Sequence, residues 1–412
     1  MSGKIKGVQS LLLEKNDSAL YSPCAAHSLN LIGVNAAKMC PKVVTYFGYV
    51  QQLYVFFSSS PARWSILKDE IGNSLHSQSN TRWSSRIHAI RPISKQLPSI
   101  INALDRVINE LGKTLPEKNH SEVKSMKKYF TTFKSLIMSS FWYKILSCID
   151  QRNVIIQKRG ISLDVEINLL SDLKKDLQNI RDSWPQILLE TQQVAKEMQI
   201  VQHFGDNTRR IKRKKKFIDE TSENTEPEMV FRNDVIYYTI DFILSDLEHR
   251  FQAVKNICNI FEPLLNFLSL TNEELELKTK SLVQKYKYDL SENMCQEMLH
   301  LKTIYSSTFQ KSHVMPPLEL LNSIYAKNVQ TIFVNVCISL RIFCTIPVTV
   351  AEAERSFSNL GNSLKTWQRS TTSQERLNSL AILSMENELA STINFDDIIT
   401  EFAELKARRI KF

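Results

Sequence analysis

The sequence has few glycines, only 9 among 412 residues. Tight hairpins and many-stranded sheets use glycine at turn positions, so this scarcity argues against an all-β fold and favours long helices. The length allows two or three domains, each large enough for a hydrophobic core. Apolar residues make up 43% and charged residues 23%, so the chain also lacks the composition of a disordered protein.

A disulfide framework is missing as well. The 7 cysteines, at positions 24, 40, 148, 258, 295, 337 and 344, are odd in number and scattered, which predicts free thiols in a reducing compartment. The first ten residues contain no apolar run typical of a secretory signal. The most apolar stretch, 331–350, contains Asn335, Arg341 and Pro347, so it predicts buried core and not a membrane span. We therefore expect an intracellular protein without a membrane partner.

Basic residues outnumber acidic ones, and the formal net charge is +9. A basic balance favours polyanionic partners such as DNA. Part of the excess is concentrated in one run, which comprises Arg209, Arg210, Lys212, Arg213, Lys214, Lys215 and Lys216. An acidic polar stretch follows, and this alternation without apolar periodicity predicts an exposed, disordered loop over 207–230. We interpret the run as a nuclear-import signal in preference to a DNA contact, and expect a nuclear protein.

Between 96 and 310 the pattern is that of a helical array. Apolar residues recur at helical spacing, for example Leu163, Leu170, Leu173, Leu177 and Ile180. A further helical unit is expected from about residue 350 to the C-terminus, whereas residues 19–22 are a candidate short strand. The sequence thus predicts a mainly α protein.

The first of three motifs contains Cys24 and His27, with two alanines between them. This spacing suits two zinc ligands, and Cys40 is a candidate third. A structural zinc site needs four ligands, and the sequence has no second close pair. The alternative, which we prefer, is a buried cysteine and a hydrogen-bonded histidine at a strand-to-helix junction.

The second motif runs from Thr81 to Arg86 and contains Arg82 and Trp83. An exposed tryptophan can stack on a base while Arg82 or Arg86 contacts a phosphate, so these three residues are a candidate nucleic-acid site. The alternative is a Trp83 packed in a helix interface, and the motif taken alone favours it.

The third motif follows Pro347 and reads Ala353-Glu354-Arg355-Ser356-Phe357-Ser358. Thr349 is a plausible N-cap for a helix here, and Val350, Ala353, Phe357 and Leu360 would form one apolar seam. Glu354 lies at the border of that seam, where a partly buried carboxylate can reach a metal ion or an arginine. Taken alone, this position favours an ion pair with an arginine.

The order of the three motifs resembles hAT-superfamily transposases, including the transposase-derived part of zinc finger MYM-type proteins. The resemblance covers nearly the whole chain and is most specific over 340–412. It implies a truncated RNase H-like (α/β) core over 1–95 that bears the first two motifs. A large α-helical insertion over 96–310 and a C-terminal dimerisation region over 311–412 would follow.

The resemblance also implies roles for single residues. Glu354 matches the catalytic glutamate of the family, and Trp83 matches a tryptophan associated with the distorted DNA end. Cys24 and His27 match a pair close to the active site. Intact family members hold two Mg²⁺ or Mn²⁺ ions with this glutamate and two aspartates, which precede the Cys-x-x-His block and have no match here. We therefore expect no metal cofactor and no enzymatic activity unless an upstream extension supplies them.

The leading hypothesis is a truncated or degenerate transposase-derived protein that self-associates through its C-terminal region. Apolar residues available for this interface or for the core are Phe343, Phe357, Leu360, Leu377, Leu380 and Leu383. The alternatives are a sequence-tolerant DNA-binding protein and, given upstream aspartates, an active DNA transposase.

Overall fold

The computed structural model describes residues 7–78, 84–158, 160–205, 226–350 and 371–404, together with Phe357, Leu364, Thr366 and Arg369. These residues are mostly helical, and none of them forms a strand. The predicted mainly α class is therefore confirmed, the candidate strand at 19–22 is wrong, and the RNase H-like core stays a prediction. The chain divides into two compact units, Met1–Thr349 and Val350–Phe412.

Four helices open the described part of the first unit, and several of their ends have a local cause. Helix α1 spans Val8–Lys15, α2 spans Ala25–Ala36, α3 spans Pro41–Ser58 and α4 spans Pro61–Ile71. Helices α3 and α4 both begin with proline, whose fixed φ suits the first helical turn. The α4 helix ends at Gly72, whose φ of 64° is a left-handed conformation that glycine adopts without strain.

Helix α5 spans Ser84–Leu111 and contains Pro92 and Pro98. Gln96 departs from helical geometry, with φ −136° and ψ 30°, because Pro98 lacks the N–H that would continue the helix. The freed Gln96 side chain donates to the carbonyl of Ile71 at 3.2 Å, which ties the kink to α4. Helix α6, Glu117–Phe130, follows after a short 3₁₀ turn.

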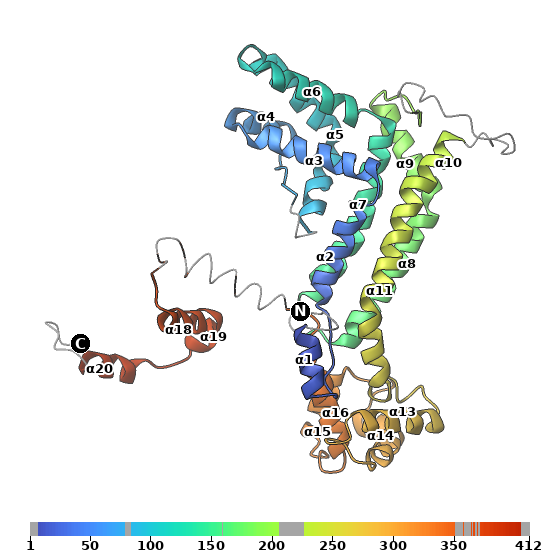
Figure 1. Ribbon diagram of the computed structural model, residues 1–412, viewed down its shortest axis with the longest axis vertical. Coiled ribbons are helices and arrows are strands. Elements are labelled where there is room, and N and C mark those ends of the chain that lie inside the picture. The colour runs from blue at the N-terminus through green and yellow to red at the C-terminus, as the bar shows by residue number, and fades with distance from the viewer. Residues whose placement is uncertain are drawn as a thin grey trace. The chain divides into compact units, whose positions relative to one another are not determined.

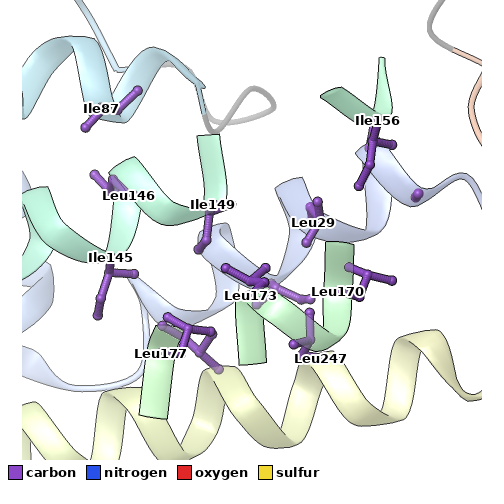
Figure 2. Close-up of a cluster of buried hydrophobic side chains, with 14 of the residues drawn as sticks. Leu29, Ile87, Ile145, Leu146, Ile149, Ile156, Leu170, Leu173, Leu177 and Leu247 are labelled. Carbon is purple, nitrogen blue, oxygen red and sulfur yellow. The ribbon is translucent and has the colours of Figure 1, made fainter. Parts of the chain in front are cut away.

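Long helices form the middle of this unit. They are α7 (Phe133–Ile156), α8 (Leu163–Asp182), α9 (Trp184–Glu197) and α11 (Tyr238–Ile260). Helices α2, α7, α8 and α11 run side by side (Figure 1). Their facing side chains form a core that includes Leu29, Ile149, Leu173 and Leu247 (Figure 2). The predicted apolar positions Leu170, Leu173 and Leu177 are confirmed as buried.

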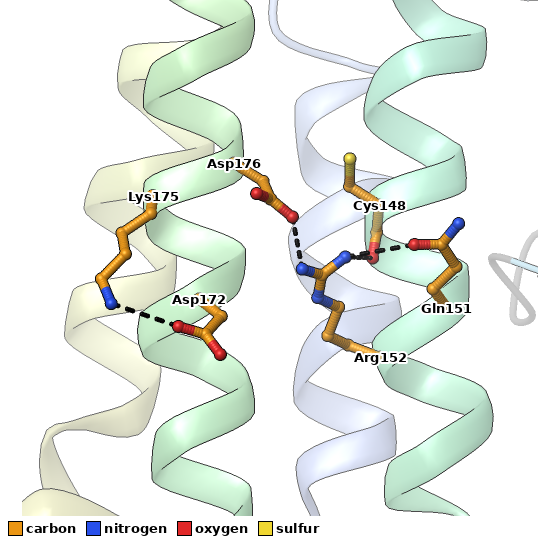
Figure 3. A network of polar contacts seen from close by, with 6 residues as sticks. All are labelled: Cys148, Gln151, Arg152, Asp172, Lys175 and Asp176. Carbon is orange, nitrogen blue, oxygen red and sulfur yellow. Dashed lines mark hydrogen bonds and ion pairs between the residues drawn. The ribbon is translucent and has the colours of Figure 1, made fainter.

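Polar contacts join α7 to α8 beside this core (Figure 3). The Arg152 guanidinium forms an ion pair with Asp176 and also donates to the Gln151 side chain at 3.3 Å. On the outer side of α8, Lys175 pairs with Asp172 at 3.2 Å, and both of these side chains are exposed.

Five helices gather at the far end of the unit, below α11 in Figure 1. They are α12 (Glu262–Leu265), α13 (Asn272–Lys285), α14 (Met294–Phe309), α15 (Pro317–Ala326) and α16 (Val334–Cys344). Helix α16 comes from the most apolar stretch of the chain and buries Val336, Leu340 and Phe343. The prediction of a core segment there is confirmed, and no helix within the described ranges is long and apolar enough to cross a membrane.

The predicted loop over 207–230 lies largely outside the described residues, and the basic run from Arg209 to Lys216 lies wholly outside them. Its last residues are helical, because α10 spans Pro227–Phe231 and leads through a π-helical turn, Arg232–Tyr237, into α11. The second unit contains α18 (Gln374–Met385), α19 (Asn387–Ala390) and α20 (Asp396–Glu404).

Candidate functional site

The Cys-x-x-His motif lies at the start of α2 and contacts the segment just before the third motif. Cys24 is the N-cap residue of α2, and its Sγ lies 3.8 Å from Oγ1 of Thr349. The backbone N–H of Ala25 donates to the carbonyl of Val348 at 3.0 Å. Val348 is itself buried. The first motif and the segment just before the third motif, which are more than 300 positions apart in the sequence, therefore meet in the first unit.

The partners of Cys24 and His27 differ from those of a metal site. Cys24 is half-buried, whereas the His27 side chain is exposed. Within the described part of the chain, no three histidine, cysteine or acidic side chains are grouped so that they could hold a metal ion. Cys24 thus contributes to packing at a helix start, although the preceding residues have no regular secondary structure and do not form the strand that the motif suggested.

The Thr-Arg-Trp motif is only partly described, since Arg82 and Trp83 lie outside the described residues. Arg86 is on α5 and is 5% exposed. Its guanidinium carbon lies 4.8 Å from the centre of the Phe47 ring, and burial lowers the pKa of this group to about 10. This position favours cation–π packing between α5 and α3 over a phosphate contact for Arg86.

The third motif follows directly on the Val348–Thr349 contact, but Glu354 and Leu360 lie outside the described residues. Phe343, a candidate for interface or core, belongs to the core: it is 2% exposed and packs edge-on against Phe261 at 5.2 Å. Phe357 is exposed.

The α18–α20 segment exposes many of its apolar side chains. Of the predicted residues, Leu377 is buried, Leu380 is half-buried and Leu383 is exposed. Sequence reasoning missed further exposed apolar residues, which include Ile382 at 63% exposure, Leu389 at 62%, Ile398 and Ile399. The last two follow the exposed Phe395 at three- and four-residue spacing, a signal of one helical face that is visible in the sequence.

Comparison with known proteins agrees with the motifs. Residues 305–389 match the hAT family C-terminal dimerisation region. The chain is 23% identical over 441 residues to the 52 kDa repressor of the inhibitor of the protein kinase from Mus musculus, and the match covers 96% of this chain. The protein of the same name from Homo sapiens is 23% identical over 433 residues, with the same coverage.

The chain spans about half the length of these relatives, 52% in each case. The resemblance first drawn from the three motifs is confirmed by the family match and by relatives that align along almost the whole chain. This chain therefore carries, over residues 305–389, a segment that matches the C-terminal dimerisation region of the hAT family, and almost its whole length is similar to these relatives.

Proposed function

We propose that this chain self-associates through its C-terminal unit, Val350–Phe412. The observation that carries the proposal is the apolar surface of α18–α20, on which Ile382, Leu389 and Ile398 are each more than half exposed. Monomeric soluble proteins rarely expose large contiguous apolar patches, and such patches mark interfaces. The match to a dimerisation region over 305–389 supports the same conclusion for α18 and α19.

The oligomeric state of the full chain tests this proposal. Size-exclusion chromatography with light scattering at micromolar concentration should report twice the monomer mass. The double variant Ile382→Glu and Leu389→Glu places two charges on the apolar surface and should give a monomer with unchanged helical circular dichroism. Ser384→Glu, at an exposed polar position on the same helix, should remain dimeric. A wild-type chain that is monomeric under these conditions would overturn the proposal.

We propose further that this chain alone does not cut or join DNA. Glu354 is the single residue here that matches a catalytic carboxylate of the family, and one carboxylate cannot fix two divalent cations. Incubation of plasmid DNA with the purified chain and Mg²⁺ or Mn²⁺ should leave the plasmid supercoiled. Metal-dependent nicking that disappears in Glu354→Gln would contradict this proposal.

A further inference from the structure

A groove of about 950 Å³ lies at one end of the helical array, and none of its lining residues belongs to the three motifs. Its walls come from the first turn of α3, the last turn of α6, the first turn of α7, the segment after α9, and α10. Its size is within the range of specific binding sites.

The floor of the groove is apolar. Phe133, Met138 and Phe231 line it and are each largely buried. The Phe204 ring lies behind them, 5.3 Å from that of Phe133 and 5.8 Å from that of Phe231, and so supports the floor. Methionine adapts its shape to different apolar groups, so the floor suits an inserted side chain rather than one rigid ligand.

Among the described residues, the charged side chains that line the groove are all basic or histidine. They are Lys42, Lys128, Lys134 and His203, and no aspartate or glutamate of the described ranges lines this groove. Helices α3 and α7 begin here while α6 and α9 end here, so the helix dipoles oppose one another. The charged side chains therefore determine the sign of the electrostatic potential in the groove. Lys42 lies over the Phe231 ring, with Nζ 5.6 Å from the ring centre, which places positive charge directly beside the apolar floor.

We propose that this groove binds an acidic peptide segment of a partner protein. Carboxylates of the peptide would meet Lys42 and Lys128, and an apolar side chain between them would enter the floor. A single-stranded nucleic acid fits less well because it needs open aromatic faces. Tyr129 lines the groove, but its ring is already stacked on Tyr49, with ring centres 3.9 Å apart.

Fluorescence anisotropy on the full chain tests the proposal. The probe is a short labelled peptide of aspartates and glutamates around one phenylalanine and one leucine. Its matched control carries asparagine and glutamine in place of the acids. The acidic peptide should bind at micromolar concentration at low salt, at least about tenfold more tightly than the amide control, and binding should weaken as salt rises.

Single-residue variants test whether the acidic peptide binds in this groove. Lys42→Glu and Lys128→Glu should each weaken the acidic peptide about tenfold or more, since each reverses a charge on the rim. Lys124→Glu changes an exposed lysine on α6 that does not line the groove, and it should leave the affinity unchanged. Val201→Ser, at an 81% exposed apolar position that does line the groove, should weaken both peptides.

Three outcomes would overturn the proposal. The first is no binding of the acidic peptide at low salt, and the second is equal binding of the acidic and amide peptides. The third is a labelled single-stranded oligonucleotide that binds more tightly than the peptide and is released by Lys128→Glu. Because the readout is peptide affinity, the outcome is independent of whether the chain dimerises.

Discussion

The Sγ atom of Cys24 lies 3.8 Å from Oγ1 of Thr349, although the two residues are 325 positions apart. The next residue, Ala25, donates its N–H to the carbonyl of Val348. The start of α2 is thereby joined to the chain that leads into Glu354. The first motif and the segment just before the third motif therefore each supply half of one packed junction.

Thr349→Cys should allow a disulfide with Cys24. Two sulfur atoms at these positions would lie within a short rotation of bonding distance, whereas the native pair cannot cross-link. Mild oxidation followed by peptide mapping should recover the 24–349 disulfide. Thr345→Cys, at an exposed position four residues earlier, should not link to Cys24. Equal cross-linking of the two variants would show that the junction does not have this geometry.

Replacement of Arg86 should affect stability more than nucleic-acid binding. Arg86→Met keeps the aliphatic stem but removes the guanidinium from the Phe47 ring, and we expect a loss of about 1–3 kcal/mol in the free energy of unfolding. Arg91→Met, at an exposed position on the same helix, should change it by less than about 0.5 kcal/mol. Urea unfolding measures the free energy of unfolding of both variants. An unchanged stability together with reduced DNA affinity would restore the nucleic-acid role predicted from the motif.

The helices were predictable because their apolar residues repeat with the helical period. Leu170, Leu173 and Leu177 are buried as that period requires. The surroundings of single residues were not predictable, since they depend on tertiary contacts. Nothing near Arg86 in the sequence indicates that Phe47 lies under its guanidinium, and no local pattern unites Lys42, Lys128 and His203 around one groove.

Whether an apolar residue lies in the core or on the surface also depends on tertiary contacts. Phe343 and Leu383 both have apolar neighbours in the sequence, but Phe343 packs against the ring of Phe261, which lies between α11 and α12, whereas Leu383 is exposed. Helical periodicity shows which face is apolar and leaves open whether the same chain covers that face. The exposed face of Phe395, Ile398 and Ile399 is such a case.

The ion pair between Arg152 and Asp176 should contribute more than its exposed neighbour (Figure 3). The Arg152 side chain is 16% exposed, so loss of Asp176 leaves a poorly solvated charge. We expect Asp176→Asn to lower the free energy of unfolding by about 1–3 kcal/mol. Asp172→Asn breaks the exposed pair with Lys175 and should cost less than about 0.5 kcal/mol. Similar effects of the two variants in urea unfolding would show that burial does not distinguish the pairs.

Glu166 should make the protein less stable as pH rises. Its side chain is fully buried on α8, neither carboxyl oxygen has a hydrogen-bond partner within the described part of the chain, and burial raises its pKa from 4.5 to about 8. Below pH 4.5 the carboxyl is protonated in both states and has no effect. Between pH 4.5 and 8 only the unfolded state ionises, so the free energy of unfolding falls by up to about 1.4 kcal/mol for each pH unit.

Glu166→Gln removes this titration and should therefore stabilise the protein by about 3 kcal/mol at pH 7, with little change near pH 4. Nearby Cys258 will not obscure the effect, since burial and the carboxylates of Asp164 and Glu166 raise the pKa of its thiol to about 12. Urea unfolding of both proteins from pH 4 to 8 measures the difference. Glu273→Gln, at an exposed position on α13, is the matched control and should follow the wild-type curve. If Glu166→Gln also follows the wild-type curve, Glu166 is ionised in the folded state. A counter-charge or a water molecule must then stabilise its carboxylate.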